Sequence, residues 1–586
     1  MATTPTARNP RLADYSADYR MLILAAMAVV AGTGGALSAW ALLKLIAFAT
    51  NVLWYGSFSS APAVIAGRGP LLVLIIPIIG GLVVGLMARF GSDKIRGHGI
   101  PEAIETILFG DSKLSLKVAI LKPISSAVSI GSGGPFGAEG PIIMTGGAIG
   151  SLFAQLFRLS AAERKTLLVA GATAGMTGIF GTPFAAIMLA VELLLFEWKP
   201  RSFVPVVTAV LVALAWRPLL VGSGPLFPFS AATPAGIEPV AISAGIGIAA
   251  GLLAAFLSFA LYRIEDGFHA LPIHWMWWPA IGAVVVGIGG LFDLRVLGAG
   301  YGSIQDLLNG DLVVKAVLLL LVVKAVVWLV ALGSGTSGGI LAPLLILGGC
   351  AGFLIGQYLP GDPGFWAMIG MAGVMSGVMR APMTGALFAA ELTNHLSALP
   401  ETIAAGAAAY AVSVLIMKRS ILTEKIARRG RHISREYTVD ALEFLQAGQL
   451  MTRDPETLRG DMPLDQAARF FADEAIHRSY PVVDEQGRLL GLVSRQDALQ
   501  WRVAGHAEGR LGEALSDAST GYAFPETPCG EVADMMVESG VGRVPVIDRE
   551  SRRVVGIISR QDLLKVREQH KKVEEVRTRG GDEATD

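Results

Sequence analysis

The residues best suited to chemistry lie in one glycine-rich stretch, 131–141, which reads Gly-Ser-Gly-Gly-Pro-Phe-Gly-Ala-Glu-Gly-Pro. An apolar segment at 142–157 follows it and predicts a helix. Glycines let the backbone approach another group closely, and Pro141 suits the first turn of a helix. The unpaired N–H groups of such a turn carry partial positive charge, so this stretch predicts an anion site.

Glu139 places a carboxylate in the same turn. An acid inside a membrane is energetically costly and usually marks a pathway for ions or protons. The alternative is that Glu139 only caps its helix, although Ser or Asp at a wet helix end performs that task at lower cost.

Composition places the chain in a membrane. Of its 586 residues 53% are hydrophobic and only 16% are charged, whereas soluble domains carry about a quarter charged residues. The net charge of zero argues against a nucleic acid partner. Cys350 and Cys529 lie too far apart to suggest a disulfide framework, and they lack the spacing of a metal site.

Polarity divides the chain into parts. Basic residues flank the apolar region on both sides, which predicts that both termini and the soluble part are cytoplasmic. The expected parts are a cytoplasmic N-terminal tail (1–19), a transmembrane domain (20–430) in two halves (20–222 and 238–430), a linker (431–446), two soluble domains (447–505 and 506–568) and a charged, disordered tail (569–586). The expected long spans are 21–49, 71–88, 204–221, 239–262 and 312–332, and the segments too short or broken to cross alone are 97–109, 115–126, 167–180 and 183–195.

Two internal repeats organise these parts. The stretch at 131–141 aligns without gaps with 333–343, and a second block at 171–193 matches 370–392 at nearly the same offset. Membrane transporters with two related halves bind substrate between them, on broken helix ends near the midplane. In the soluble part, 479–497 recurs as 543–562, so we expect two small α/β modules of about 55 residues each.

Together these motifs resemble the CLC family of chloride channels and chloride/proton exchangers, followed by a tandem pair of cystathionine-β-synthase (CBS) domains. Three family signatures stand in order: Gly-His-Gly-Ile-Pro at 97–101, Gly-Ala-Glu-Gly-Pro at 137–141 and Gly-Gly-Ile-Leu-Ala-Pro at 338–343. The resemblance implies an α-helical multi-pass membrane protein with an inverted repeat, a cytoplasmic α/β CBS pair and a homodimer in a lipid bilayer. It implies chloride or a similar small anion as substrate and Glu139 as the gating glutamate.

The resemblance also assigns the anion site. The residues expected to bind the anion are His98, Gly99, Gly137, Ala138, Glu139, Ile340, Leu341 and Leu422. Backbone N–H groups suit this purpose because partial charges attract an anion and still release it. Lys122 matches a family lysine and could raise the potential along the pathway; the alternative is a lysine that snorkels to an interface.

The departures from the family pattern bear on mechanism. His98 replaces the usual coordinating serine and Leu422 the usual tyrosine. His98 therefore either serves the anion, as an N–H donor or as a cation at low pH, or is a satisfied polar residue in a turn. The exchangers' internal proton glutamate is Leu193 here. We therefore expect passive chloride conduction, with chloride/proton antiport as the alternative.

In the CBS pair, Ser494 with Asp497 and Ser559 with Asp562 match the family positions for ribose and phosphate of an adenosine nucleotide such as ATP or AMP. An empty dimerisation module is the alternative, and no cofactor is required.

A CBS-regulated magnesium channel would need several acids within the spans, and an enzyme would need a nucleotide loop, zinc spacing or nucleophile–base pair, none of which the sequence displays. The expected location is the inner membrane of a bacterium.

Overall fold

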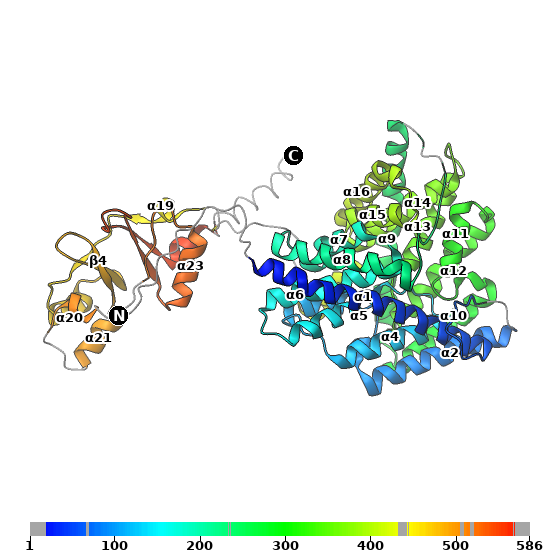
Figure 1. The fold of residues 1–586 in the computed structure, drawn as a ribbon, viewed down its shortest axis with the longest axis horizontal. Coiled ribbons are helices and arrows are strands. Elements are labelled where there is room, and N and C mark those ends of the chain that lie inside the picture. Colours follow the sequence, from blue (N-terminus) through cyan, green and yellow to red (C-terminus); the bar gives the residue numbers. More distant parts are fainter. Residues whose placement is uncertain are drawn as a thin grey trace. The chain divides into compact units, whose positions relative to one another are not determined.

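The computed structural model describes residues 19–65, 69–231, 234, 236–431, 442, 445–503, 509–515, 521–566 and 568. They divide into two units, a helical one within Ala13–Arg435 and a smaller mixed one within Glu436–Asp586 (Figure 1). The expected tail at 1–19 except Tyr19, most of the linker at 431–446 and the tail at 569–586 lie outside the described residues.

The helical unit is built from two halves with the same order of elements. The first half contains α1 (Arg20–Thr50), α2 (Pro70–Leu86), α3 (Ile100–Phe109), α4 (Leu116–Gly131), α5 (Glu139–Gln155), α6 (Ala161–Phe180), α7 (Pro183–Leu189) and α8 (Pro200–Leu220). The second half contains α9 (Ile237–His269), α10 (Trp278–Phe292), α11 (Tyr301–Asn309), α12 (Val314–Gly333), α13 (Leu341–Gly356), α14 (Pro363–Met379), α15 (Pro382–Leu392) and α16 (Leu399–Ile416). One more helix, α17 (Ile421–Arg428), follows them.

The packing of the halves is also repeated. Helix α1 lies against α6 and α8 (Figure 1), and its counterpart α9 lies against α14 and α16. In the same way α4–α5–α6 matches α12–α13–α14, while α2 pairs with α10 and α7 with α15 across the halves. The repeat predicted from the two sequence blocks therefore extends over eight helices in each half.

The helices that carry the glycine-rich stretches form the centre of the unit. Most residues of α5, α6, α13 and α14 are buried, as expected for helices that are apolar on all sides. Small residues let them cross closely: a side chain at Gly146 or Gly171 would overlap the other's carbonyl, and Gly348 and Gly370 repeat this contact. Helices α5 and α13 are thereby held rigidly at the centre.

Seven helices among the described residues are long and apolar enough to cross a membrane. They include the five long spans expected from the sequence, and they add 275–292 and 396–428. Their outward faces expose large apolar side chains such as Leu22, Leu71 and Phe256, as lipid-facing helices do. The segment 167–180 belongs to the 20-residue helix α6, which starts earlier because Ser160 and Glu163 form a capping box, and α6 is not among these seven helices.

The smaller unit contains two three-stranded sheets. Its elements are α19 (Ala447–Leu450), β1 (Thr452–Arg453), β2 (Leu458–Arg459), α20 (Leu464–Asp473), β3 (Ser479–Val483), β4 (Leu489–Ser494), α21 (Arg495–Val503), α22 (Leu511–Ala514), α23 (Cys529–Glu538), β5 (Arg543–Ile547) and β6 (Val554–Ser559). One sheet has the order β2-β3-β4, with β2 parallel to β3, and the other has the order β1-β6-β5 and is antiparallel.

The two soluble modules share one sheet and one core, which the sequence repeat alone does not show. Strand β1 pairs with β6 of the second module, with Thr452 opposite Ile557. Ala447, from the same early segment, is buried in the core that contains Val532 and Val546. The early segment that contains Ala447 and β1 therefore belongs to the second module, and the chain forms the first module before it completes the second.

Candidate functional site

The two glycine-rich turns meet at the centre of the helical unit. The Gly137 N–H donates to the Gly339 carbonyl at 3.1 Å, and the Gly339 N–H donates to the Gly137 carbonyl at 2.8 Å. Helix α5 begins two residues after Gly137 and α13 two residues after Gly339, so their N-termini converge from different halves. The first-turn N–H groups of a helix have no carbonyl partner within it, and here two such sets face one place.

The Glu139 side chain lies in the space between these turns. It is fully buried, and a Cβ atom at Gly339 would lie 2.6 Å from its Oε2 atom. The carboxylate faces the N–H groups of Glu139 itself and Ala342 and the hydroxyl of Tyr301. Neither of its oxygens completes a hydrogen bond of good geometry among the described residues. Glu139 is therefore placed where converging donors would hold an anion, and it does not simply cap a wet helix end.

The bridge between the turns changes the list of expected donors. The Gly137 N–H is occupied by the Gly339 carbonyl, so the prediction that this amide faces an anion is corrected. Ala342, which the sequence interpretation left out, supplies an N–H on the second helix. Ile340 and Leu341 stand at the start of α13 and Ala138 at the start of α5, and their roles stay predictions.

Lys122 is fully buried on α4 beneath the turn at 97–99. Its ammonium group donates to the carbonyls of Ile95 at 2.8 Å and Gly97 at 2.6 Å and to Ser337 Oγ at 3.0 Å. Ser125 and Ser126 also contact the Ser337 hydroxyl. The alternative of a snorkelling lysine is therefore wrong, because Lys122 joins the first half to the turn that precedes α13.

A second buried lysine, Lys324 on α12, repeats this arrangement and was missed from the sequence. It donates to the carbonyls of Val296 at 2.8 Å and Gly298 at 3.0 Å. Its position relative to the second glycine-rich stretch matches that of Lys122 relative to the first, and this was the signal in the sequence. The segment Gly-Ala-Gly-Tyr-Gly at 298–302 is likewise the counterpart of Gly-His-Gly-Ile-Pro at 97–101.

A cavity of about 350 Å³ opens beside His98, and we call it the His98 cavity. Gly99 has a φ of 90°, a left-handed turn that presses the His98 carbonyl against Gly140 in the first turn of α5. His98 is itself buried, and its Nδ1 atom has no partner among the described residues. An unpaired ring nitrogen fits a ligand or water at this position better than the satisfied-turn alternative.

Charged side chains of both signs line the His98 cavity: the acids are Asp93 and Glu265, and most of the basic residues come from α17 and its C-cap. Glu102 on α3 forms ion pairs with Lys425 at 2.9 Å and Arg429 at 3.3 Å, and Arg429 also pairs with Glu105 at 2.5 Å. Lys425, Arg428 and Arg429 line the cavity. Anions that enter it meet a predominantly basic wall.

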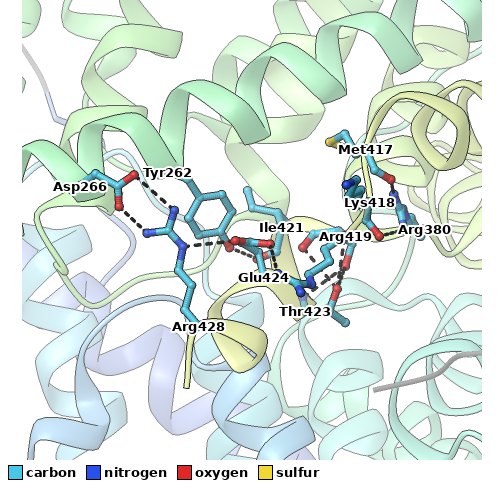
Figure 2. Close-up of polar contacts among 11 residues, drawn as sticks. Tyr262, Asp266, Arg380, Met417, Lys418, Arg419, Ile421, Thr423, Glu424 and Arg428 are labelled. Atoms are coloured by element: carbon cyan, nitrogen blue, oxygen red, sulfur yellow. Dashed lines mark hydrogen bonds and ion pairs between the residues drawn. The ribbon is translucent and has the colours of Figure 1, made fainter. Parts of the chain in front are cut away.

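Figure 2 shows how α17 is fixed to the helical unit. Arg428 bridges Asp266 on α9 and Glu424 on its own helix, and the Tyr262 hydroxyl donates to the Ile421 carbonyl (Figure 2). Leu422 is fully buried in the main hydrophobic core, whereas Tyr262 lines the His98 cavity. The structure thus provides no polar side chain at position 422 and brings a different tyrosine to this cavity.

A second cavity, of about 630 Å³, lies next to Ala138 and Tyr301, and we call it the Tyr301 cavity. Its wall includes Gly298 and Gly300, which have left-handed φ angles of 67° and 74°, as Gly97 and Gly99 do in the first half. An inverted repeat places equivalent turns on opposite sides of the membrane midplane. The two cavities are lined by equivalent turns of the two halves, at 97–98 and 298–300.

The acids of the second repeated block tie the halves together. Glu192 accepts hydrogen bonds from the N–H groups of Met383 and Thr384 at the start of α15, at 3.1 and 2.8 Å. Glu391 accepts them from Phe184 and Ala185 at the start of α7, at 3.0 and 2.7 Å. Each half thus caps a helix of the other.

In the smaller unit the predicted nucleotide residues bond to one another. The Ser494 hydroxyl donates to Asp497 Oδ2 at 2.6 Å, and the Asp497 N–H donates back to Ser494 Oγ at 3.3 Å. Ser559 and Asp562 repeat both bonds at 2.6 and 3.3 Å. These pairs cap α21 and the helix at 560–566, so nucleotide binding stays a prediction.

Comparison with known proteins decides the family. The model of the family described as "Voltage gated chloride channel" matches residues 79–414, and the CBS domain model matches 447–504 and 522–569. The chain belongs to the voltage gated chloride channel family. The CLC resemblance and the helical fold with a C-terminal CBS pair are thereby confirmed.

Among CLC relatives, "Voltage-gated ClC-type chloride channel ClcB" of Salmonella typhimurium is 28% identical over 372 residues, which cover 62% of this chain and 88% of the relative. The protein of the same name from Escherichia coli (strain SMS-3-5 / SECEC) is 27% identical, with coverages of 61% and 87%.

Solved structures agree on the fold. A slow cyanobacterial Cl⁻/H⁺ antiporter superposes with a TM-score of 0.61 at 22% identity, over 71% of this chain and 99% of that one. A eukaryotic CLC transporter superposes with a TM-score of 0.59 at 19% identity, over 93% and 98%. A CLC-type fluoride/proton antiporter gives 0.60 at 19% identity, over 68% and 97%.

Proposed function

We propose that this CLC protein exchanges chloride, or a similar small anion, for protons across the membrane, and that Glu139 is both the gate and the proton carrier. The observation that carries the proposal is the position of the Glu139 carboxylate. It lies between the two converging helix N-termini, buried and facing the N–H groups of Glu139 and Ala342.

Competition for these donors couples the two ions. An ionised Glu139 and an anion need the same partial positive charges, so only one of them occupies the site at a time. When Glu139 takes up a proton it no longer needs these donors, and the anion can replace it. Binding of an anion then favours a protonated, displaced Glu139, which is the linkage that an exchanger needs.

The surroundings of the site support exchange. Two cavities lie near the site: Ala138, next to Glu139, lines the Tyr301 cavity, and the His98 cavity is lined by His98, whose carbonyl lies against Gly140. Two of the structural neighbours are described as a Cl⁻/H⁺ antiporter and a fluoride/proton antiporter, whereas the curated relatives are called chloride channels. We therefore replace passive conduction, the expectation drawn from Leu193, with exchange as the leading proposal.

Passive conduction remains the second candidate because of Leu193. This position, which carries the internal proton glutamate in exchangers, is a fully buried leucine in the apolar core. An exchanger with this residue must bring protons to Glu139 by another route. The His98 cavity is the route we propose, since it contains the unpaired ring nitrogen of His98.

The test uses the purified full-length protein in liposomes with an outward chloride gradient and no initial pH difference. Exchange predicts that chloride efflux drives protons inward and acidifies the vesicle interior, which a trapped pH dye reports. Glu139→Gln is the matched variant and is expected to move chloride without protons. Chloride efflux without acidification in the wild type would instead establish passive conduction, and absence of any chloride flux would refute both candidates.

The remaining assignments are part of the same proposal. We propose a homodimer in a bacterial inner membrane, with both termini and the CBS pair in the cytoplasm, and with domain boundaries at 430, 446, 505 and 568. Regulation by the CBS pair, through an adenosine nucleotide at Ser494, Asp497, Ser559 and Asp562, is proposed on the family pattern alone.

A further inference from the structure

Tyr301, the first residue of α11, has a buried hydroxyl with no hydrogen-bond partner among the described residues. Its ring packs edge-on against Phe227, with 5.8 Å between the ring centroids. A buried hydroxyl without a partner costs free energy, and native proteins rarely leave one without a reason. The reason here must lie in what the hydroxyl faces.

The hydroxyl faces the Glu139 carboxylate and lies beside the Ala138 N–H. Both Glu139 oxygens are also buried and without a partner of good geometry. Three orphaned polar atoms, one donor and two acceptors, therefore gather at one place. A small rotation of either side chain would complete an O–H···O⁻ bond, which is among the stronger hydrogen bonds in proteins.

The backbone that presents Tyr301 is held firmly. Lys324 binds the carbonyls of Val296 and Gly298, just before the turn that ends at Tyr301. Gly300 adopts a left-handed φ of 74°, and a side chain there would meet Ile346 of α13 at 2.6 Å. The turn is thus packed against the same helix whose N-terminus faces Glu139.

Other groups near the site do not replace this hydroxyl. The ammonium groups of Lys122 and Lys324 donate to backbone carbonyls, and His98 faces the other cavity. Tyr301 is the titratable side chain that faces the Glu139 carboxylate among the described residues.

We infer that Tyr301 is a positioning residue of the gate, whose hydroxyl donates to the ionised Glu139 carboxylate and keeps it between the two helix N-termini. When Glu139 is protonated or displaced, this bond is lost and the acid swings toward the Tyr301 cavity. The inference rests on the proposed role of Glu139.

Four proteins test it in the liposome chloride-efflux assay: wild type, Tyr301→Phe, Glu139→Gln and the double variant. Phenylalanine keeps the ring and removes only the hydroxyl, so the packing against Phe227 is preserved. Tyr410→Phe is the control, because Tyr410 is exposed on α16 and lines neither cavity. We expect Tyr301→Phe to raise efflux at neutral pH about tenfold and to shift the pH of half-maximal efflux upward by about one unit, since one hydrogen bond to a charged group is lost.

The expected effect must disappear when the acid is absent. In the Glu139→Gln background, Tyr301→Phe should change efflux less than about twofold, because no carboxylate remains to be held. Equal effects in both backgrounds would overturn the inference and assign the hydroxyl to the anion, and an unchanged pH profile of Tyr301→Phe would overturn it as well.

If Tyr301→Phe does not fold, Phe227→Leu loosens the ring and must shift the same profile upward; no shift would again overturn the inference. Failure of the proposed function is distinguishable, because Glu139→Gln would then behave like the wild type.

Discussion

Gly137→Ala tests whether the Glu139 carboxylate closes the pathway. A Cβ atom at position 137 would overlap both carboxylate oxygens and lie 2.5 Å from the Cδ atom of Glu139. Ordinary carbon–carbon contact needs about 3.5 Å, so the carboxylate must move by about 1 Å or more. The displaced group is the end of a flexible side chain, and Gly137 does not have a positive φ, so the fold should tolerate alanine.

The displacement sets the size of the effect. A shift of about 1 Å takes the carboxylate away from the partial positive charges of the N–H groups that it faces. In a buried site, a negative charge at a helix N-terminus is stabilised by about 1–2 kcal/mol, so its loss corresponds to a rise of about 5- to 30-fold in the population of the open gate. We expect chloride efflux from liposomes at pH 7.5 to rise by about tenfold, with less proton movement per chloride.

Gly339→Ala is the matched contrast. A Cβ atom there would lie 2.6 Å from the Gly137 carbonyl oxygen and 3.0 Å from its carbon, and this backbone cannot yield as a side chain does. We expect this variant to lose the bridge between the turns and to unfold at lower temperature. The reasoning is refuted if Gly137→Ala is folded, as judged by its elution from a sizing column, and yet conducts chloride at the wild-type rate.

Two further predictions concern the supports of the structure. Lys122→Met should lower the melting temperature and the chloride flux, because each carbonyl left without a donor, such as that of Gly97, costs about 1–3 kcal/mol. The control is Lys117→Met, since Lys117 is exposed on the same helix. Equal melting curves of the two variants would contradict the prediction. Ser494→Ala should speed amide hydrogen exchange in α21 about fivefold without any nucleotide, because losing a helix cap costs about 1 kcal/mol. If amide hydrogen exchange in α21 changes only when ATP is present, the Ser494 hydroxyl binds the nucleotide and does not stabilise the helix through Asp497.

Much of the helical unit is predictable from the sequence because its cause is local. Long apolar runs predict the spans, and the repeated glycine-rich stretches predict that Glu139 lies at a junction of two halves. Which atoms meet there is not local. The mutual bond between Gly137 and Gly339 uses a donor that the motif alone left free, and Ala342 takes its place.

Other features gave weak signals. Tyr301 follows a short glycine-rich segment whose likeness to 97–101 is limited to two glycines, and Lys324 stands among the apolar residues at 316–333, which carry no other charge. Strand β1 has two residues and therefore no alternation of polarity that could predict its exchange into the second sheet. The roles of Tyr301, Lys324 and β1 all depend on which distant segment each of them contacts.

The caps at Glu192 and Glu391 have a consequence for the origin of the fold. Each acid stands at the same place in its half and binds the same helix start in the other half. A single-half polypeptide that inserted into the membrane in both orientations would form both bonds with its own inverted copy. Fusion of two such copies would therefore need no new bond at this junction.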